Sequence, residues 1–123
     1  MAKKVLYIED SPIDTRIVKE ALEEAGITVE VAATGEEGLR KASQMKPDLI
    51  LLDLILPDTN GFKLCAEIRR EMGLDKTLII VLSIKDDVDD ITKAFTVGAD
   101  DYIIKPPLPD FLTKKVKLYL GMK

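Results

Sequence analysis

Acidic side chains follow directly after two short apolar runs of the sequence, and a lysine follows directly after a third. The residues are Glu9 and Asp10, Asp53, and Lys105. Short apolar runs are typical of buried parallel strands, and in an open α/β sheet the carboxyl ends of such strands line the functional crevice. We therefore expect these four side chains to meet at one edge of a sheet. Carboxylates beside a lysine indicate a divalent cation and phosphate chemistry.

The three acidic residues suit the ligand preferences of Mg²⁺, or of Mn²⁺ in its place. Mg²⁺ takes near-octahedral oxygen ligands at about 2.0–2.1 Å and usually keeps several waters. We expect Asp10 and Asp53 to be direct ligands and Glu9 to reach the ion through water. Without an ion, carboxylates packed together would repel and raise one another's pKa values, so metal and protons should compete for this site.

Two polar residues at the ends of apolar runs are placed to contact a phosphate group. Lys105 provides a point charge, and Ser83 adds a hydroxyl donor at the same sheet edge. The chain has no histidine and a single cysteine, which excludes Ser-His-Asp and Cys-His catalysis and any phosphohistidine within the chain. A carboxylate is then the candidate nucleophile, and Asp53 is the best placed of the three.

Composition limits the other classes of function. The 123 residues suit one domain, which we expect to span residues 1–123. The net charge of −4 argues against direct nucleic-acid binding, and no apolar stretch reaches the roughly 18 residues of a membrane span. The first apolar run is too short for a secretory signal, so we expect a cytoplasmic location. The helical core spacing of Cys65 predicts a plain buried thiol.

Predicted strands and helices alternate at short, regular spacing. Strands are predicted over residues 4–9, 28–32, 49–53, 78–83 and 101–104. Helices are predicted to begin at Ser11-Pro12, at Thr34, near Asn60, near Val88 and near Pro109. Five strands and five helices in strict alternation predict an α/β fold with a parallel sheet, helices on both faces and right-handed crossovers.

Three of the predicted helices carry apolar stripes that we expect to face the sheet. In the first helix, Ile13, Ile17 and Ala21 recur four residues apart, and Leu22 and Ala25 widen the stripe. The stripes of the fourth and fifth helices are Val88, Ile91 and Phe95, and Leu112, Val116, Tyr119 and Leu120.

An ordered set of motifs along the whole chain resembles the receiver domain of two-component response regulators, in its single-domain, chemotaxis-regulator-like form. The set is Glu9-Asp10, Asp53, Pro57, Gly61, Ser83, Gly98-Ala99-Asp100-Asp101-Tyr102 and Lys105-Pro106, in the family's order and spacing. One such motif alone would be weak, whereas the set is specific. The resemblance implies a flavodoxin-like, doubly wound sheet with strand order 2-1-3-4-5 and a cis bond between Lys105 and Pro106.

The resemblance also implies how the site residues divide their roles. Asp53 would be the phospho-acceptor, with Glu9 and Asp10 as the acidic pocket and the backbone carbonyl of Ile55 completing the metal site. The donor would be the phosphohistidine of a sensor histidine kinase or of a histidine phosphotransfer protein. The chain would then be a phosphorylation-gated signalling module of a phosphorelay rather than an enzyme.

Three residues would connect phosphorylation to output. By the resemblance, Lys105 senses the phosphate, Ser83 is the switch hydroxyl, and Tyr102 is the switch aromatic that turns inward when Ser83 moves. The surface formed by the fourth helix, fifth strand and fifth helix would then change for an unknown output partner, or for a phosphorylation-dependent homodimer.

Two departures from the family pattern lie side by side. Ser83 replaces the commoner threonine and keeps the hydroxyl. Ile84 stands where a small alanine is usual, and a β-branched side chain there would crowd the phosphoryl group and block attacking water. We therefore predict that self-dephosphorylation is slow and that Ile84 tunes the phosphoryl lifetime.

Two other functions fit parts of the pattern. A haloacid-dehalogenase-like phosphohydrolase also uses an aspartyl nucleophile at a strand end, but it needs a second acid two residues later, where this chain has Ile55. A degenerate receiver would bind partners constitutively without being phosphorylated. The complete acidic pocket together with Ser83 and Lys105 argues against that alternative.

Overall fold

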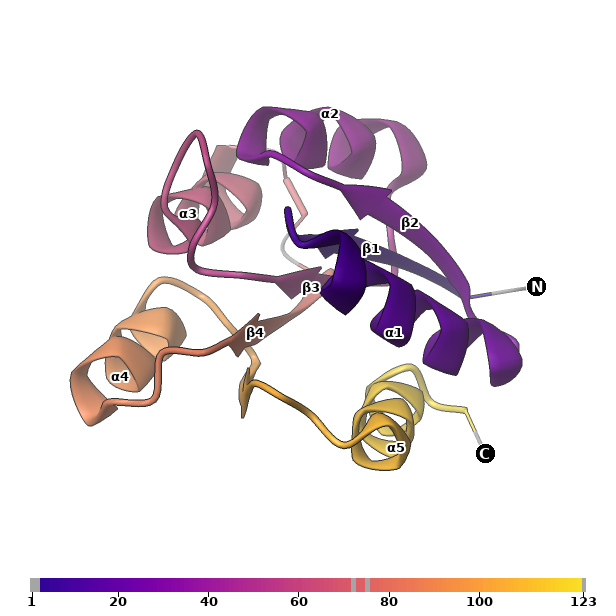
Figure 1. Ribbon diagram of the computed structural model, residues 1–123. Helices are drawn as coiled ribbons and strands as arrows, with labels where there is room; N and C mark the ends of the chain where they lie inside the picture. The colour runs from indigo at the N-terminus through magenta and orange to yellow at the C-terminus, as the bar shows by residue number, and fades with distance from the viewer. Residues whose placement is uncertain (1–2, 72, 75, 123) are drawn as a thin grey trace.

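A computed structural model describes residues 3–71, 73–74 and 76–122, and it has the predicted alternation of strands and helices (Figure 1). The strands are β1 (Lys4–Ile8), β2 (Thr28–Ala32), β3 (Leu49–Leu52), β4 (Leu78–Ser83) and β5 (Asp101–Ile104). The helices are α1 (Pro12–Glu24), α2 (Gly35–Met45), α3 (Gly61–Glu71), α4 (Val88–Thr96) and α5 (Pro109–Tyr119). Within the part of the chain that the structure describes, no helix has the length and apolar character needed to cross a membrane.

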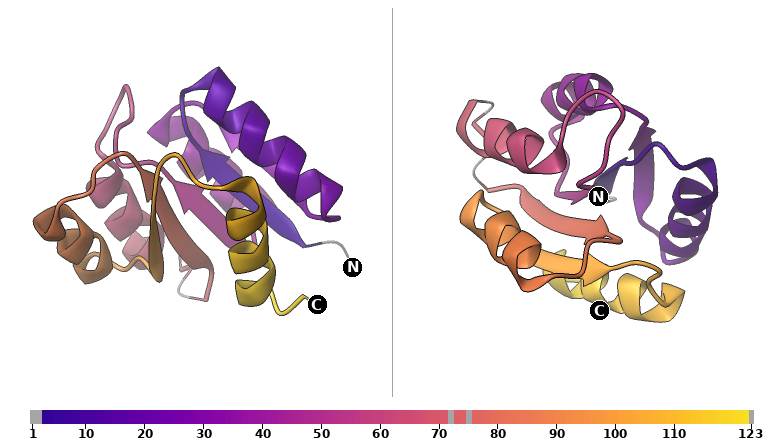
Figure 2. Two further views of the ribbon diagram at one scale, coloured as in Figure 1. Left: turned by 60° about the horizontal axis from the view of Figure 1, so that its bottom comes forward. Right: turned by 60° about the vertical axis from the view of Figure 1, so that its left-hand side comes forward.

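The strands form one parallel sheet in the order β2-β1-β3-β4-β5, which confirms the predicted flavodoxin-like topology. Helices α1 and α5 lie side by side on one face, and α2, α3 and α4 cover the other (Figure 2). Strands β1 and β3 are adjacent at the centre, in register from Val5 opposite Leu49 to Ile8 opposite Leu52. The ends of these two strands therefore open side by side at one edge of the sheet.

Burial on both faces explains why the central strands are continuous apolar runs. In β1, Val5 and Tyr7 pack into the core under α1 and α5, whereas Leu6 and Ile8 pack into the core on the opposite face. Successive side chains of a strand point to opposite faces, so a strand covered on both sides has no position left for a polar residue. The charged residues begin only where the strand ends.

Side-chain caps begin four of the five helices at this same edge. The residues Ser11, Thr34, Asn60 and Asp87 each accept a hydrogen bond from the backbone N–H three residues later, at 2.8–3.3 Å. Each cap satisfies one of the N–H groups that the first turn of a helix leaves unpaired. The starts at Ser11 and Thr34 were predicted from this pattern, and the structure confirms both.

The predicted apolar stripe of α1 is partly wrong. Val18 and Leu22 are the buried residues of this helix, while Ile13 and Ile17 are exposed. Apolar residues from position 13 to position 25 cover about half of the helix circumference at 100° per residue, so spacing alone leaves the buried side undecided. Contact with β2 and α5 selects the half that contains Val18.

The prediction that the apolar stripe of α4 faces the core is also wrong. Ala94 is the buried residue of this helix, and both Val88 and Phe95 are exposed. Helix α4 packs near β5, which is an edge strand of the sheet. Among the described residues, no strand lies beyond β5 in the sheet, so the outer side of α4 stays uncovered. The stripe of α5 is confirmed, because Leu112 and Val116 are buried.

Arg69 of α3 joins three segments of the chain at the edge of the sheet opposite the acidic residues. Its Nε donates to the Gly98 carbonyl at 2.9 Å, and Nη1 donates to the carbonyls of Leu74, at 3.2 Å, and Thr77. Its Nη2 pairs with Asp100. This one side chain therefore connects α3 to the loop before β4 and to the turn between α4 and β5.

We predict that Arg69→Ala lowers the free energy of unfolding by about 2–4 kcal/mol, because it leaves several carbonyls and a carboxylate without their charged donor. Urea unfolding followed by circular dichroism measures the change. Arg70→Ala is the matched control, since Arg70 is the exposed neighbour on the same helix, and its effect should stay within about 0.5 kcal/mol. Equal losses in the two variants would contradict the role assigned to Arg69.

Candidate functional site

The register of β1 and β3 brings the predicted acidic residues together. Because Ile8 lies opposite Leu52, the residues that follow them, Glu9 and Asp53, are neighbours, and the Asp53 N–H donates to the Ile8 carbonyl at 3.1 Å. Carboxylate oxygens of Glu9, Asp10 and Asp53 all lie within 4.8 Å of one another. The expectation that these three side chains share one sheet edge is therefore confirmed.

Glu9 is the most deeply buried member of this acidic cluster. Its Oε2 accepts the N–H groups of Asp10 at 2.9 Å and Ser11 at 3.2 Å, and its Oε1 lies 3.4 Å from the Tyr7 hydroxyl. Burial raises the pKa of Glu9 to about 7; the hydrogen bond from Lys105 opposes this rise, and the nearby Asp53 charge adds to it. The contribution of the Asp53 charge agrees with the prediction that neighbouring carboxylates raise one another's pKa values, whereas the larger contribution of burial was not predicted.

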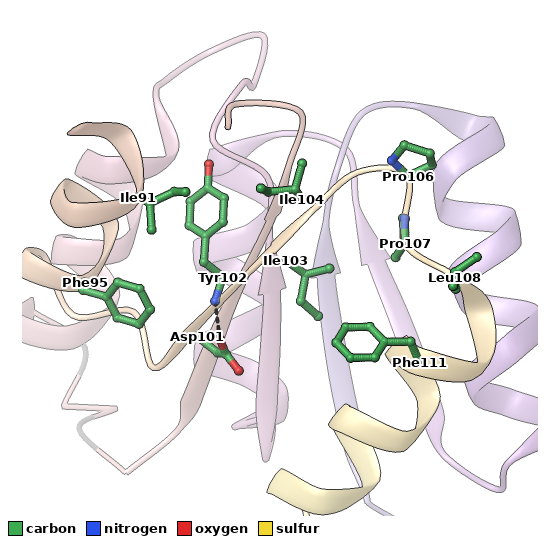
Figure 3. A pocket seen from close by; sticks show the side chains of 10 residues that line it. All are labelled: Ile91, Phe95, Asp101, Tyr102, Ile103, Ile104, Pro106, Pro107, Leu108 and Phe111. Carbon is green, nitrogen blue, oxygen red and sulfur yellow. Dashed lines mark hydrogen bonds between the residues drawn. The ribbon is translucent and has the colours of Figure 1, made fainter. Parts of the chain in front are cut away.

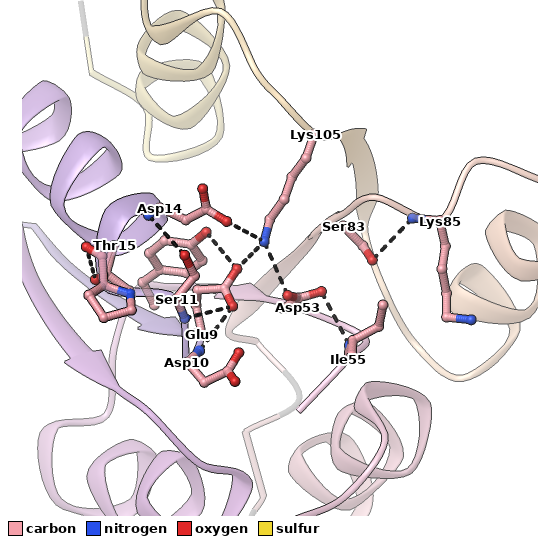
Figure 4. Close-up of polar contacts among 12 residues, drawn as sticks. Glu9, Asp10, Ser11, Asp14, Thr15, Asp53, Ile55, Ser83, Lys85 and Lys105 are labelled. Atoms are coloured by element: carbon pink, nitrogen blue, oxygen red, sulfur yellow. Dashed lines mark hydrogen bonds and ion pairs between the residues drawn. The ribbon is translucent and has the colours of Figure 1, made fainter. Parts of the chain in front are cut away.

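Lys105 reaches the cluster from the end of β5. Its Nζ contacts Glu9, lies 3.0 Å from Asp14 Oδ2, and lies 3.1 Å from Asp53 Oδ2 (Figure 4). The peptide bond between Lys105 and Pro106 is cis, as the resemblance implied. Burial lowers the pKa of Lys105, but the hydrogen bonds to Glu9 and Asp14 and the Asp53 charge more than offset this, so that its pKa lies above its usual value.

The surroundings of Asp53 leave little free space behind it. Its Oδ1 accepts the Ile55 N–H at 3.2 Å, and its Oδ2 faces Lys105. Helix α3 begins against the same loop, where a Cβ added to Gly61 would lie 2.5 Å from the Asp53 carbonyl oxygen and 2.6 Å from Leu54 Cα. Only glycine allows α3 to start this close to the end of β3.

The two predicted switch residues meet at the loop after β4. Ser83 is fully buried, and its Oγ accepts the Lys85 N–H at 3.4 Å. The Tyr102 hydroxyl donates to the Lys85 carbonyl at 2.6 Å, so the tyrosine ring is directed toward this loop. Both side chains therefore bind Lys85, a residue of the β4–α4 loop. Ile84 lies between Ser83 and Lys85 in the sequence, and its side chain is exposed.

The sequence alone did not identify Asp14 as a member of this site. Asp14 is an acidic residue in the first turn of α1, where its charge interacts favourably with the helix dipole. The structure places its carboxylate on Lys105. Its position one helical turn after Asp10, in a helix that begins at the functional edge, is the signal that could have identified it.

A groove of about 460 Å³ lies between α4 and α5 over β5 (Figure 3). The exposed apolar residues on its walls are Phe95 of α4, Ile104 of β5, and Leu108 and Phe111 at α5. Tyr102 also lines the groove, with its hydroxyl bound to the Lys85 carbonyl. One side chain thus connects the loop beside the acidic cluster to an exposed apolar surface.

A parallel sheet with an acidic cluster, a lysine and a buried hydroxyl at its carboxyl edge defines a receiver domain of two-component signalling. The chain belongs to the response regulator receiver domain family, whose model matches residues 5–117. Receiver domains are signalling modules that bind Mg²⁺ at an acidic pocket and take part in two-component systems with a histidine kinase.

Relatives and solved structures support this assignment. The chain is 37% identical over 120 residues to the alkaline phosphatase synthesis transcriptional regulatory protein PhoP of Bacillus subtilis, covering 98% of this chain and 49% of that protein. It is 40% identical over 103 residues to the response regulator ArlR of Staphylococcus saprophyticus, covering 84% of this chain and 46% of that protein. The chain spans about half the length of the curated relatives it matches.

The solved structures agree over nearly the whole chain. The BeF3-activated receiver domain of DrrB has a TM-score of 0.89 and 31% identity, covering 98% of this chain and 99% of that one. A CheY-like receiver domain protein from Methanospirillum hungatei has a TM-score of 0.92 and 30% identity, covering 98% and 95%. The fold and the family predicted from the sequence are therefore both confirmed.

We predict that Gly61→Ala disturbs the site as well as the fold, because its Cβ would push α3 away from the Asp53 carbonyl. The variant should lose about 1–3 kcal/mol of unfolding free energy and bind beryllofluoride with Mg²⁺ more weakly. Asn60→Ala is the control, since it removes the cap of the same helix without adding a clash. If the two variants lose stability and beryllofluoride affinity alike, the close approach of α3 to the Asp53 carbonyl at Gly61 is not the cause of the loss.

Proposed function

We propose that this chain accepts a phosphoryl group on Asp53 from the phosphohistidine of a sensor histidine kinase or a histidine phosphotransfer protein. The observation that carries the proposal is the contact of Lys105 Nζ with Asp53 Oδ2 at 3.1 Å, beside the buried Glu9 and the exposed Asp10. An acceptor carboxylate, an acidic cluster and a cation are thus gathered at one sheet edge. We further propose that residues 1–123 act as one receiver domain.

The proposed transfer balances with the residues at hand. An Asp53 carboxylate oxygen attacks the phosphorus and forms a P–O bond, while the P–N bond of the donor breaks and its electron pair returns to the donor imidazole. Lys105 offsets the negative charge that accumulates on the transferring group. The donor histidine belongs to the partner, because this chain contains none.

The acidic cluster fits a hard divalent cation, Mg²⁺ or Mn²⁺. Its donors are carboxylate oxygens within 4.8 Å of one another, which is the donor type that these ions prefer. We propose Asp10, Asp53 and the Ile55 carbonyl as direct ligands, with Glu9 acting through water. When bound, the ion supplies positive charge that stabilises the transferring phosphoryl group.

We propose that Ser83 and Lys105 bind the new phosphoryl oxygens and that Tyr102 passes the change to the α4–β5–α5 face. The shared contact of Ser83 and Tyr102 with Lys85 supports this, because movement of Ser83 toward Asp53 would release one of two bonds to that residue. The apolar groove beside Tyr102 is then the surface presented to an output partner or to a second phosphorylated copy. We also propose that this chain lies in the cytoplasm, where the phosphohistidine of a kinase donor would reach it.

Asp53→Asn tests the proposal directly. Incubation of wild type with Mg²⁺ and acetyl phosphate should add one phosphoryl group, seen by intact mass, and beryllofluoride with Mg²⁺ should change the tyrosine fluorescence. Both responses should vanish in Asp53→Asn, because the amide is not a nucleophile. Asp110→Asn, at the exposed start of α5, should keep both responses. A phosphoryl group that still appears in Asp53→Asn would refute the acceptor assignment.

We propose that Ile84 makes self-dephosphorylation slow. Its side chain is 65% exposed directly after Ser83, the last residue of β4. We propose that it covers the side of the phosphoryl group that faces solvent. Ile84→Ala should shorten the phosphoryl lifetime several-fold, because water reaches the group more easily, as measured by loss of ³²P after removal of the donor. Leu118→Ala, at the far end of α5, should leave the lifetime unchanged. An equal or longer lifetime in Ile84→Ala would exclude this role.

A further inference from the structure

We propose that Asp14 is a positioning residue for Lys105: it holds the ammonium on the α1 side of the cluster while Asp53 is unphosphorylated, and it releases the ammonium when a phosphoryl group arrives. The carboxylate Oδ2 of Asp14 lies 3.0 Å from Lys105 Nζ, and Asp53 Oδ2 lies at a similar distance of 3.1 Å. Figure 4 shows Asp14 and Asp53 approaching the ammonium from different sides. This inference rests on the proposed function of Asp53 and Lys105.

Competition follows from the number of donors on the ammonium. A lysine ammonium has three N–H donors and no acceptor, and Glu9, Asp14 and Asp53 already provide three carboxylate partners. A phosphoryl oxygen on Asp53 needs one of these donors. After the transfer Asp53 is an acyl phosphate, so Lys105 keeps a donor on this residue only through a phosphoryl oxygen. Moving toward that oxygen weakens the contact of the ammonium with Glu9 or with Asp14.

Burial decides which partner is released. Of the two carboxylates that remain after the transfer, the side chain of Glu9 is 1% exposed, whereas that of Asp14 is 40% exposed. A carboxylate that loses its cation in a buried place stays unsolvated at high cost, while an exposed one regains water. Asp14 is thus the partner whose release costs least.

The local structure allows this exchange. The Asp14 backbone is fixed in the first turn of α1 by the N-cap, since its N–H donates to Ser11 Oγ at 3.3 Å. A cavity of about 70 Å³ borders the side chains of Asp14, Lys105 and Tyr7. The Asp14 backbone therefore stays in place, and the cavity gives the lysine side chain room to change partners.

The negative charge of Asp14 has opposite effects on the affinities of the site for a divalent cation and for a phosphoryl group. Its negative charge adds to the field that attracts a divalent cation, but it opposes an anionic phosphoryl group and engages the lysine that should receive it. Removing the charge should weaken cation binding and strengthen binding of a phosphoryl mimic. General damage to the site would weaken both.

Asp14→Asn tests the inference by tyrosine fluorescence, since the three tyrosines include Tyr7 beside Glu9. At saturating Mg²⁺, the half-saturating beryllofluoride concentration should fall about two- to fivefold, the range expected for one partly exposed ion pair. Asp14→Ala, which removes the acceptor altogether, should lower it at least as far. With Mg²⁺ alone, the half-saturating Mg²⁺ concentration should rise in both variants.

Glu24→Gln is the matched control, because it removes one negative charge at the far end of the same helix, and both affinities should stay at the wild-type values. Unchanged or weaker beryllofluoride binding in Asp14→Asn would overturn the role of Asp14 if wild type responds and Asp53→Asn does not. If wild type gives no response, or if the response survives in Asp53→Asn, the proposed function itself fails, and the inference fails with it.

Discussion

The contact of one lysine ammonium with three carboxylates is the interaction on which the rest of the functional edge depends. Glu9 and Asp53 are almost fully buried, and two such carboxylates side by side would repel each other in a medium of low dielectric. Lys105 reduces this repulsion by contacting both of them. The negative charges of the two buried carboxylates are therefore partly offset, and any new charge at Asp53 would change this balance.

The sheet holds these charges together through its register. Because β1 and β3 are parallel neighbours and end at matched residues, Ile8 and Leu52, their next residues must emerge together. The close start of α3 at Gly61 then narrows the space behind Asp53. Strand ends fix most of the cluster, so its geometry does not rely on long loops.

The same arrangement connects chemistry to an outer surface. Ser83 at the end of β4 and Tyr102 in β5 both bind Lys85, so the loop between β4 and α4 is held from the site and from the groove at once. A change at Asp53 that moves Ser83 would alter the support of this loop. The groove beside Tyr102, with its exposed apolar side chains, is the surface that we propose for the output partner.

The order of residues was enough to predict the alternation of strands and helices and the helix starts at Ser11 and Thr34, because apolar runs and capping residues act locally. It also predicted that Glu9, Asp10 and Asp53 meet, because parallel strands share one open edge. Which half of α1 is buried depends on the packing of the folded chain, since the apolar arc of this helix fits either side. This packing also decided that the α4 stripe stays exposed at the edge strand β5, and that Asp14 contacts Lys105. Those outcomes depend on how elements distant in sequence pack together, and residue spacing within one helix does not contain that information.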